Sequence, residues 1–277
     1  MKAVLKGQPK NARDSEREVM NYNQILIWLD SKMGKGKLKI DLKLILKIQK
    51  QVTSGLLPKY DCGFLRKRPV VVNDPLTRQI AFIPPDCDDV PQMLNDLLEF
   101  VNKNRGEIDP LILAGLLHKQ MVLIHPFMDG NGRTTRLTTK VLLSDLGLDT
   151  FNLFSFENYY NQNVTQYFAT VGEHGDYYEL APQIDFTHWL EYFTEGIIQE
   201  LLRVQKLLDM LVSHENLEPY HQSILDYLST HGRISDKDYG RLTKRADSTR
   251  ILDFKYLVEL GLIKRRGAGP STYYVIV

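Results

Sequence analysis

One stretch of the chain, HPFMDGNGRTTR at positions 125–136, gathers side chains that could do chemistry on a phosphate. The imidazole of His125 titrates near neutral pH and can take a proton from an attacking hydroxyl. The carboxylate of Asp129 is a hard oxygen ligand that can hold Mg²⁺. Arg133 and Arg136 lie three positions apart, so on a helix they share a face, and guanidinium groups suit phosphate oxygens. The stretch predicts a base beside a phosphate-binding site.

The backbone of this stretch is also expected to bind an anion. Pro126 disfavours helical geometry at His125, which places the histidine in a loop after an incoming helix. Gly130 and Gly132 permit positive φ angles and the close approach of a ligand. The next helix begins directly afterwards, so its unpaired N–H groups and its dipole face the loop. A glycine-flanked turn that leads into a helix N-terminus is a phosphate cradle.

Each of these features alone has a simpler interpretation. A histidine beside a proline is usually a structural loop residue, and an Asp before a Gly or a Gly-Asn-Gly sequence is usually turn chemistry. Two arginines three positions apart usually form a solvated helix face. The functional interpretation is favoured because all the features occur in order, between two apolar runs.

Two helices must present the stretch. Asp109-Pro110 predicts a cap and a first-turn proline before LILAGLLHKQMVLI, which is apolar almost all round and indicates a buried central helix. The helix after the stretch, RTTRLTTKVLLSDLG, ends at Gly147. Upstream, RPVVV and QIAFIPP joined by NDPLTR predict a β-hairpin. Apolar periodicity predicts further helices at 16–29, 40–52, 90–102, 156–171 and 186–208.

The last sixty residues have a different pattern. Three short helical segments are followed by LIKRRGAGPSTYYVIV, which predicts strand, glycine turn and strand, the element order of a winged helix-turn-helix module. We therefore expect two domains, 1–217 and 218–277. Residues 218–277 carry ten Lys and Arg against seven Asp and Glu, a net charge of +3. This excess is modest, so the module is a candidate for DNA binding and equally for protein docking or a homodimer contact.

The amino-acid composition is that of an ordinary globular protein. The 277 residues are 43% hydrophobic and 25% charged, and the net charge of +1 gives no general attraction to nucleic acid or anionic membrane. No run approaches the roughly 18 apolar residues of a membrane span. The N-terminus lacks an apolar signal-peptide core, and two cysteines cannot form a disulfide framework. A cytoplasmic protein with two free thiols is the expectation.

The quoted stretch resembles the Fic family signature, His-x-Phe-x-(Asp/Glu)-Gly-Asn-Gly-Arg-x-x-Arg, at every defined position. The resemblance extends over roughly residues 15 to 200, including the hairpin, the buried helix and the segment NQNVTQYF. It implies a mainly α fold, a Fic helical bundle with a β-hairpin flap. It also implies a protein adenylyltransferase that moves AMP from ATP, with Mg²⁺, to a Tyr, Thr or Ser hydroxyl of a protein target or of itself.

The resemblance assigns roles residue by residue. His125 would be the general base and Phe127 an anchor in the core. Asp129 would hold Mg²⁺. The phosphates would contact a backbone anion hole and two arginines, which are Gly130, Asn131, Gly132, Arg133 and Arg136.

Two other regions match the family less closely. The flap of Fic proteins aligns the target by strand pairing, and here its match is Ile80, Ala81, Phe82 and Ile83, although an ordinary edge hairpin would look the same. Asn163 and Tyr167 resemble residues that line the nucleoside side of the family's site. Aromatic residues at helical spacing are more often core residues, so both interpretations stay open for Tyr167.

The chain lacks one pattern that many Fic proteins carry, (Ser/Thr)-x-x-x-Glu-(Gly/Asn), whose glutamate pairs with the second motif arginine and inhibits the enzyme. We therefore expect a truncated form, or one inhibited by a partner, with Arg136 unpaired and constant activity. Three alternatives remain. The first is a Doc-type kinase, which Gly132 argues against because such relatives have a larger residue at that position. The second is a relative that uses UTP or CDP-choline, or that removes AMP, although removal needs the inhibitory glutamate that the chain lacks. The third is a DNA-binding regulator that uses the loop as a nucleotide sensor.

Overall fold

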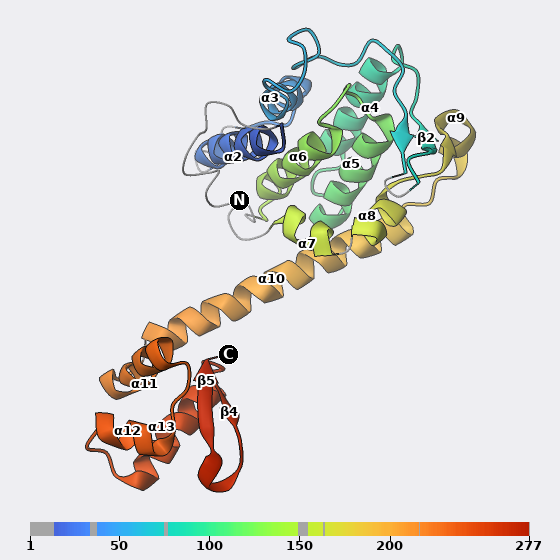
Figure 1. Ribbon diagram of the computed structural model, residues 1–277. Coiled ribbons are helices and arrows are strands. Elements are labelled where there is room, and N and C mark those ends of the chain that lie inside the picture. Colours follow the sequence, from blue (N-terminus) through green and yellow to red (C-terminus); the bar gives the residue numbers. More distant parts are fainter. Residues whose placement is uncertain are drawn as a thin grey trace. The chain divides into compact units, whose positions relative to one another are not determined.

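The computed structural model describes residues 14–33, 38–74, 77–148, 155–162, 164–215 and 217–276 (Figure 1). Most of these residues are helical and the sheets are small, so the predicted mainly α fold class is confirmed. The first five described helices are α2 (Asp14–Met33), α3 (Leu42–Val52), α4 (Val90–Lys103), α5 (Pro110–Ile124) and α6 (Asn131–Asp145), and the stretch at 125–136 joins α5 to α6. The later helices of this part are α7 (Phe156–Gln162), α8 (Val164–Val171), α9 (Tyr177–Leu180) and α10 (Thr187–Glu215).

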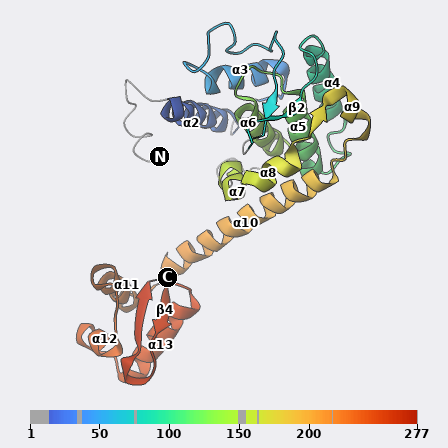
Figure 2. The ribbon, with the colours of Figure 1, turned by 45° about the vertical axis from the view of Figure 1, so that its right-hand side comes forward.

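The central helix α5 forms where its cap and its apolar sequence predict it. The carboxylate of Asp109 accepts hydrogen bonds from the backbone N–H groups of Leu111, at 2.8 Å, and Ile112, at 3.4 Å. Pro110 occupies the first helical position, where its missing N–H has no cost. The helix is buried on most sides, and α4 and α6 lie beside it in both ribbon views (Figure 2).

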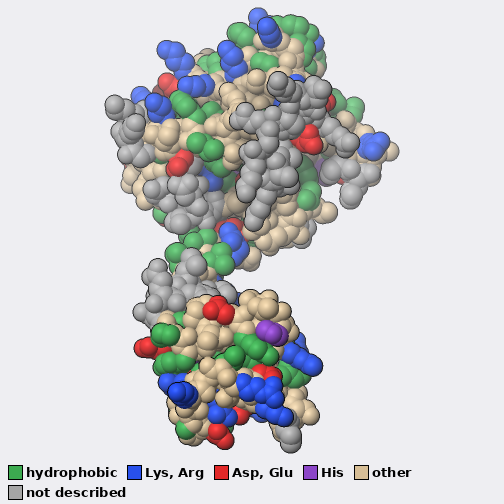
Figure 3. Space-filling model, turned by 60° about the vertical axis from the view of Figure 1, so that its left-hand side comes forward, with side chains coloured by type: hydrophobic (Ala, Val, Ile, Leu, Met, Phe, Trp, Pro, Cys, Tyr) green, Lys and Arg blue, Asp and Glu red, His purple; other side chains and the backbone are tan. Residues whose placement is uncertain are grey.

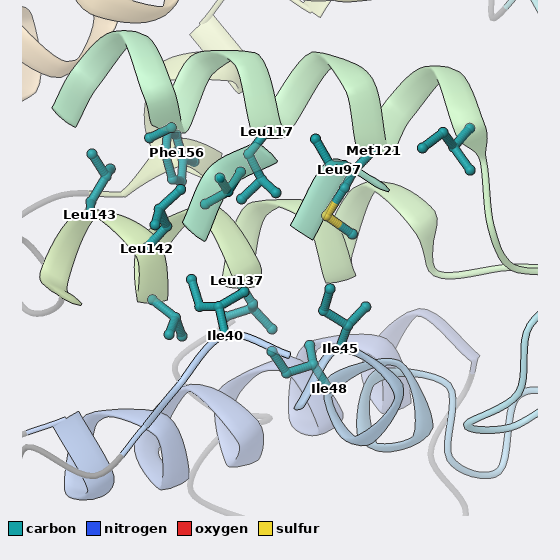
Figure 4. Close-up of a cluster of buried hydrophobic side chains, with 14 of the residues drawn as sticks. Ile40, Ile45, Ile48, Leu97, Leu117, Met121, Leu137, Leu142, Leu143 and Phe156 are labelled. Atoms are coloured by element: carbon teal, nitrogen blue, oxygen red, sulfur yellow. The ribbon is translucent and has the colours of Figure 1, made fainter. Parts of the chain in front are cut away.

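The core of this part is built by apolar stripes on α3, α4, α5 and α6. The carboxylate of Asp41 caps α3 by accepting from the N–H of Leu44 at 2.8 Å, which fixes the helix that covers α6. Figure 4 shows the packed layers, in which α3 side chains point toward α6 and α5 lies beyond. The labelled side chains are Ile40, Ile45, Ile48, Leu97, Leu117, Met121, Leu137, Leu142, Leu143 and Phe156.

A small mixed sheet lies beside the bundle. Its strands are β1 (Val72–Asn73), β2 (Ile80–Ile83) and β3 (Gly175–Asp176), in the order β1-β2-β3. Strands β1 and β2 form the predicted hairpin, and its antiparallel register changes between Val72 and Asn73. Strand β3 was not predicted; it runs parallel to β2 and pairs Gly175 with Phe82 and Asp176 with Ile83.

The chain divides into two compact units between Leu201 and Leu202, and α10 runs through this point. The expected boundary after Leu217 lies between α10 and the next helix. The second unit holds α11 (Pro219–His231), α12 (Asp236–Leu242), α13 (Asp247–Glu259), β4 (Ile263–Arg266) and β5 (Tyr273–Ile276). Three helices and an antiparallel strand pair thus occur in the order expected for a winged module, while the assignment of that module and its binding of DNA stay predictions.

The surface of the second unit mixes charge with apolar side chains. Figure 3 shows Lys and Arg side chains beside hydrophobic and acidic ones on one face. Strand β4 exposes Lys264, Arg265 and Arg266, whereas α13 exposes Ile251 and Leu252, each about 60% accessible. Among the described helices, none combines the length and the apolar character needed to cross a bilayer.

Candidate active site

His125 ends α5 in the left-handed region, with φ 49° and ψ 58°. Its Nδ1 lies 3.3 Å from the carbonyl oxygen of Val122. Because a carbonyl oxygen can only accept, this contact places the proton on Nδ1 and leaves Nε2 as the acceptor. Burial lowers the pKa of His125 to about 4, against the opposing effects of Val122 and Asp129. The imidazole is therefore neutral at neutral pH, which is the form that a general base requires.

A cavity of about 120 Å³ opens beside His125. Three parts of the chain surround it, namely the hairpin, the start of α6 and the end of α8 with the residues that follow. Its lining includes Val72, Phe82, Asn131, Gly132, Tyr167, Gly172 and Glu173. The structure thus brings the predicted base, the predicted cradle and one predicted nucleoside contact to one space.

The N-terminus of α6 has the glycine-flanked backbone that the sequence predicts, and its binding of phosphate stays a prediction. Gly130 is the cap residue with φ 80°, a conformation that favours glycine. A Cβ atom there would lie 2.7 Å from Cγ2 of Thr53, so the position has no room for a side chain. The first N–H groups of α6 have no partner within the helix and they point toward the loop.

Asn131 acts through its side chain on the loop as well as through its backbone. Its Oδ1 accepts from the N–H of Phe127 and its Nδ2 donates to the carbonyl of Phe127, both at 2.9 Å. Phe127 is fully buried in the core, as predicted. The amide of Asn131 therefore closes the loop, and its part in the anion hole is limited to the backbone N–H.

Asp129 and Arg133 face each other across the first turn of α6. Oδ2 of Asp129 lies 3.1 Å from a terminal nitrogen of Arg133, and Oδ1 accepts from the N–H of Gly130. The second terminal nitrogen of Arg133 lies 3.3 Å from the carbonyl of Val52 and 3.4 Å from the carboxylate of Glu18. This pair holds the arginine beside the cradle while half of the Asp129 side chain stays exposed.

The only sequence-predicted metal ligand is Asp129. Within the described ranges no three His, Cys, Asp or Glu side chains gather as a metal site would require. Mg²⁺ usually takes one or two carboxylates and completes its shell with phosphates and water. One half-exposed carboxylate beside a phosphate cradle fits an ion that arrives with a nucleotide.

The expectation that Arg136 is unpaired is wrong. Its Nε donates to Oε1 of Glu157 on α7 at 2.9 Å, and the hydroxyl of Tyr22 on α2 donates to the same oxygen. The hydroxyl of Ser155 donates to Oε2 of Glu157 at 3.2 Å. Burial alone would raise the pKa of Glu157, but Arg136 and Tyr22 outweigh it and hold that pKa below its usual value. A glutamate outside the known inhibitory pattern thus forms an ion pair with the second motif arginine.

The guanidinium of Arg136 also lies close to Gly132. A Cβ atom on Gly132 would be 3.3 Å from Nη1 of Arg136. One terminal nitrogen of the arginine therefore lies beside Gly132 while Glu157 holds its Nε. The absence of a side chain at Gly132 keeps this space open.

Two residues, Tyr167 and Asn163, were predicted to contact the nucleoside. Tyr167 is 6% exposed, lines the cavity and stacks on Tyr160 with ring centroids 4.2 Å apart. It is therefore a core residue that also forms part of the cavity wall, and its contact with a nucleoside stays a prediction. Asn163 lies outside the described residues.

The flap residues divide between two faces of β2. Phe82 is buried and lines the cavity, while Ile80 and Ile83 are exposed. Strand β3 already pairs with β2 at Phe82 and Ile83, so part of the edge expected to receive a target strand is covered by the chain itself. The role of Ile80, Ala81, Phe82 and Ile83 in target positioning stays a prediction.

Sequence reasoning missed two side chains that hold the loop. Arg66, 3% exposed, donates its Nε to the carbonyl of His125 at 2.8 Å and a terminal nitrogen to the carbonyls of Ile124, at 3.4 Å, and Pro85. Gln49, fully buried, donates to the carbonyl of Asp129 at 3.2 Å. The available signal for Gln49 was a polar residue on the apolar stripe of a helix. The sequence around Arg66 contained no pattern that indicated a contact with the loop.

The stretch at 125–136 lies within a region that is similar to a known family. Residues 39–143 match the model of the Fic/DOC family. The chain is 29% identical over 135 residues to the protein adenylyltransferase Fic of Drosophila grimshawi, covering 48% of this chain and 26% of that one. It is 30% identical over 131 residues to the protein of the same name from Nematostella vectensis, covering 47% and 29%. The chain thus spans less than a third of the length of these relatives.

Two solved structures share the fold. A Fic family protein from Desulfovibrio desulfuricans G20 aligns with a TM-score of 0.58 and 19% identity, covering 100% of this chain and 79% of that one. Fic-1 of Caenorhabditis elegans, residues 134–508, aligns with a TM-score of 0.54 and 21% identity, covering 75% and 57%. The predicted helical bundle with a hairpin is confirmed by these likenesses, which at such identities concern the fold alone.

Proposed function

Residues 39–143 form a Fic domain, and from this premise we propose that the chain transfers AMP from ATP to a Tyr, Thr or Ser hydroxyl of a protein. The observation that carries the proposal is a cavity lined by a neutral His125 and by Asn131 and Gly132, the first residues of α6. Arg133 and Arg136 follow in the first turns of the same helix. The names of the curated relatives, protein adenylyltransferases, support the same reaction class.

The nucleotide would lie along the wall of the cavity with its phosphates at the start of α6. Backbone N–H groups from Asn131 onward and the guanidinium groups of Arg133 and Arg136 bind the phosphate oxygens. A Mg²⁺ ion held by Asp129 would supply further positive charge at the phosphates. The nucleoside would contact Tyr167.

His125 would act on the incoming hydroxyl. Its Nε2 takes the hydroxyl proton as the oxygen bonds to the α-phosphorus, and the bond between that phosphorus and the bridging oxygen to the β-phosphate breaks. Pyrophosphate leaves with the negative charge that the arginines stabilise. Catalysis then depends on positioning and charge, and both are built into the loop by Arg66, Gln49 and Asn131.

The test supplies the protein with Mg²⁺ and ATP labelled at the α- or the γ-phosphate, with cell lysate as target, and reads the label on protein. We expect label from α-ATP alone, lost in His125→Ala and kept in His188→Ala, whose imidazole is exposed. Label from γ-ATP alone would make the protein a kinase and overturn the proposal. Label from α-ATP that survives His125→Ala would overturn the role of the histidine.

A further inference from the structure

Lys119 is a buried ammonium group that the proposed reaction does not use. It lies on the central helix α5, and 3% of its side chain is exposed. A buried charge is costly unless it is paired and hydrogen-bonded. The Nζ of Lys119 has three partners, which are Oε1 of Glu173 at 2.7 Å, the carbonyl of Thr170 at 3.3 Å and the ring of Phe186 at 5.4 Å.

Two of these partners belong to one short segment that follows α8. Thr170 lies in the last turn of α8, where carbonyl groups lack helical partners and a cation is favoured. Glu173 lies two residues after the helix ends. Lys119 therefore joins the end of α8 and the start of the following segment to the central helix.

This segment touches the active site in two ways. Val171, Gly172 and Glu173 line the cavity that His125 also lines. Gly175 and Asp176 form β3, which pairs with the flap strand β2 at Phe82 and Ile83. One segment thus supplies a wall of the cavity and the outer strand of the flap sheet, with its anchor at Glu173 between them.

We infer that Lys119 is a positioning residue for nucleotide binding, which acts by fixing Glu173 and thereby the wall of the cavity and the flap strand beside it. The inference rests on the proposed function. Without the ion pair, Glu173 is no longer tied to α5, and the wall beside it must be ordered when the nucleotide binds. Binding then weakens, whereas the reacting groups around His125 keep their own supports.

The test compares Lys119→Met, Glu173→Gln and Lys119→Arg with the wild-type protein. Methionine keeps the volume and removes the charge, and the carboxylate of Glu173, 25% exposed, can then be solvated. We expect the KM for ATP to rise about tenfold in Lys119→Met and Glu173→Gln while kcat stays within about threefold, the signature of lost ground-state binding. Lys119→Arg keeps the charge and should restore most of the affinity.

Arg105→Met is the matched control, because it breaks the ion pair between Arg105 and Asp145. Neither of these residues belongs to the proposed active site. Arg105→Met should leave the KM for ATP unchanged. Calorimetric titration with a non-reactive ATP analogue measures the same effect without turnover. Wild-type affinity in Lys119→Met, or equal losses in the control, would overturn the inference alone. A wild-type protein that binds ATP and labels nothing would instead count against the proposed function.

Discussion

The Nε of Arg136 lies 2.9 Å from Oε1 of Glu157, and the terminal nitrogen Nη1 of the same guanidinium lies over Gly132. The two ends of the arginine therefore have different tasks in the structure. One edge is fixed by a carboxylate on α7, and the other is presented to the phosphate cradle. This geometry makes Glu157 an anchor for Arg136, whose guanidinium also interacts with the hydroxyl groups of Tyr22 and Tyr167.

Glu157→Gln tests this relationship. We expect kcat/KM for ATP to fall about tenfold, because the guanidinium loses a charged partner that fixes its orientation. Labelling rates at varied ATP measure the effect. Glu99→Gln, an exposed change on α4, should have none. If Glu157→Gln were faster than the wild type, the carboxylate would be a competitor of the phosphate and the anchor role would be refuted.

The pH dependence should follow His125. Because burial lowers its pKa to about 4, the base form persists well into the acid range. We expect kcat/KM to be constant from about pH 8 to pH 5.5 and to decline toward pH 4. Circular dichroism over the same range separates titration from unfolding. An acid limb centred near pH 6.5 would show that the histidine is solvated in the working enzyme.

The same shift affects stability. The unfolded chain binds a proton at His125 with a pKa of about 6.5, whereas the folded chain does so at about 4, so the unfolded state holds more protons between these values. The contribution of this residue to the free energy of unfolding therefore falls as pH drops through that window. Urea titrations at several pH values should show a shallower acid loss in His125→Ala than in the wild type.

Gly130→Ala should destabilise the protein by about 1–3 kcal/mol, because the new methyl group meets a positive φ and the side chain of Thr53. Gly106→Ala is the matched control, since its φ of 84° is nearly the same and no atom lies within 4 Å of its Cβ position. Thermal unfolding of both variants separates the backbone cost from the steric one. Equal losses would mean that Thr53 moves aside freely.

Arg66→Lys should reduce kcat about tenfold or more, because an ammonium group cannot serve the carbonyls of His125, Ile124 and Pro85 with one planar fork. Arg68→Lys, two residues away and largely exposed, is the control and should behave as wild type. Single-turnover labelling at saturating ATP measures the effect. An unchanged rate would mean that the loop holds its conformation without Arg66.

The sequence predicted the loop, its two helices and the hairpin, because each is defined by local chemistry. Pro126 ends a helix, Gly130 needs a left-handed backbone, and the flanking runs are periodic. The partners of these residues were not predictable in the same way. Glu157 meets Arg136, and Lys119 meets Glu173, across 21 and 54 positions of sequence. Such contacts depend on how helices pack, and a single charged residue in a helical pattern does not reveal them.

The hydrogen bonds of Asn131 have a consequence for the ageing of the protein. Asn131-Gly132 is the dipeptide in which asparagine loses its amide group most readily, because the small glycine lets its nitrogen attack the side-chain carbonyl carbon. In the folded chain Oδ1 of Asn131 accepts from the N–H of Phe127, and its Nδ2 donates to the carbonyl of Phe127. The backbone nitrogen of Gly132 lies in the first turn of α6. Attack requires the side chain to rotate away from these partners. Deamidation of Asn131 therefore requires local unfolding of the loop. The amount of deamidated protein in a stored sample then reports how often the loop unfolds.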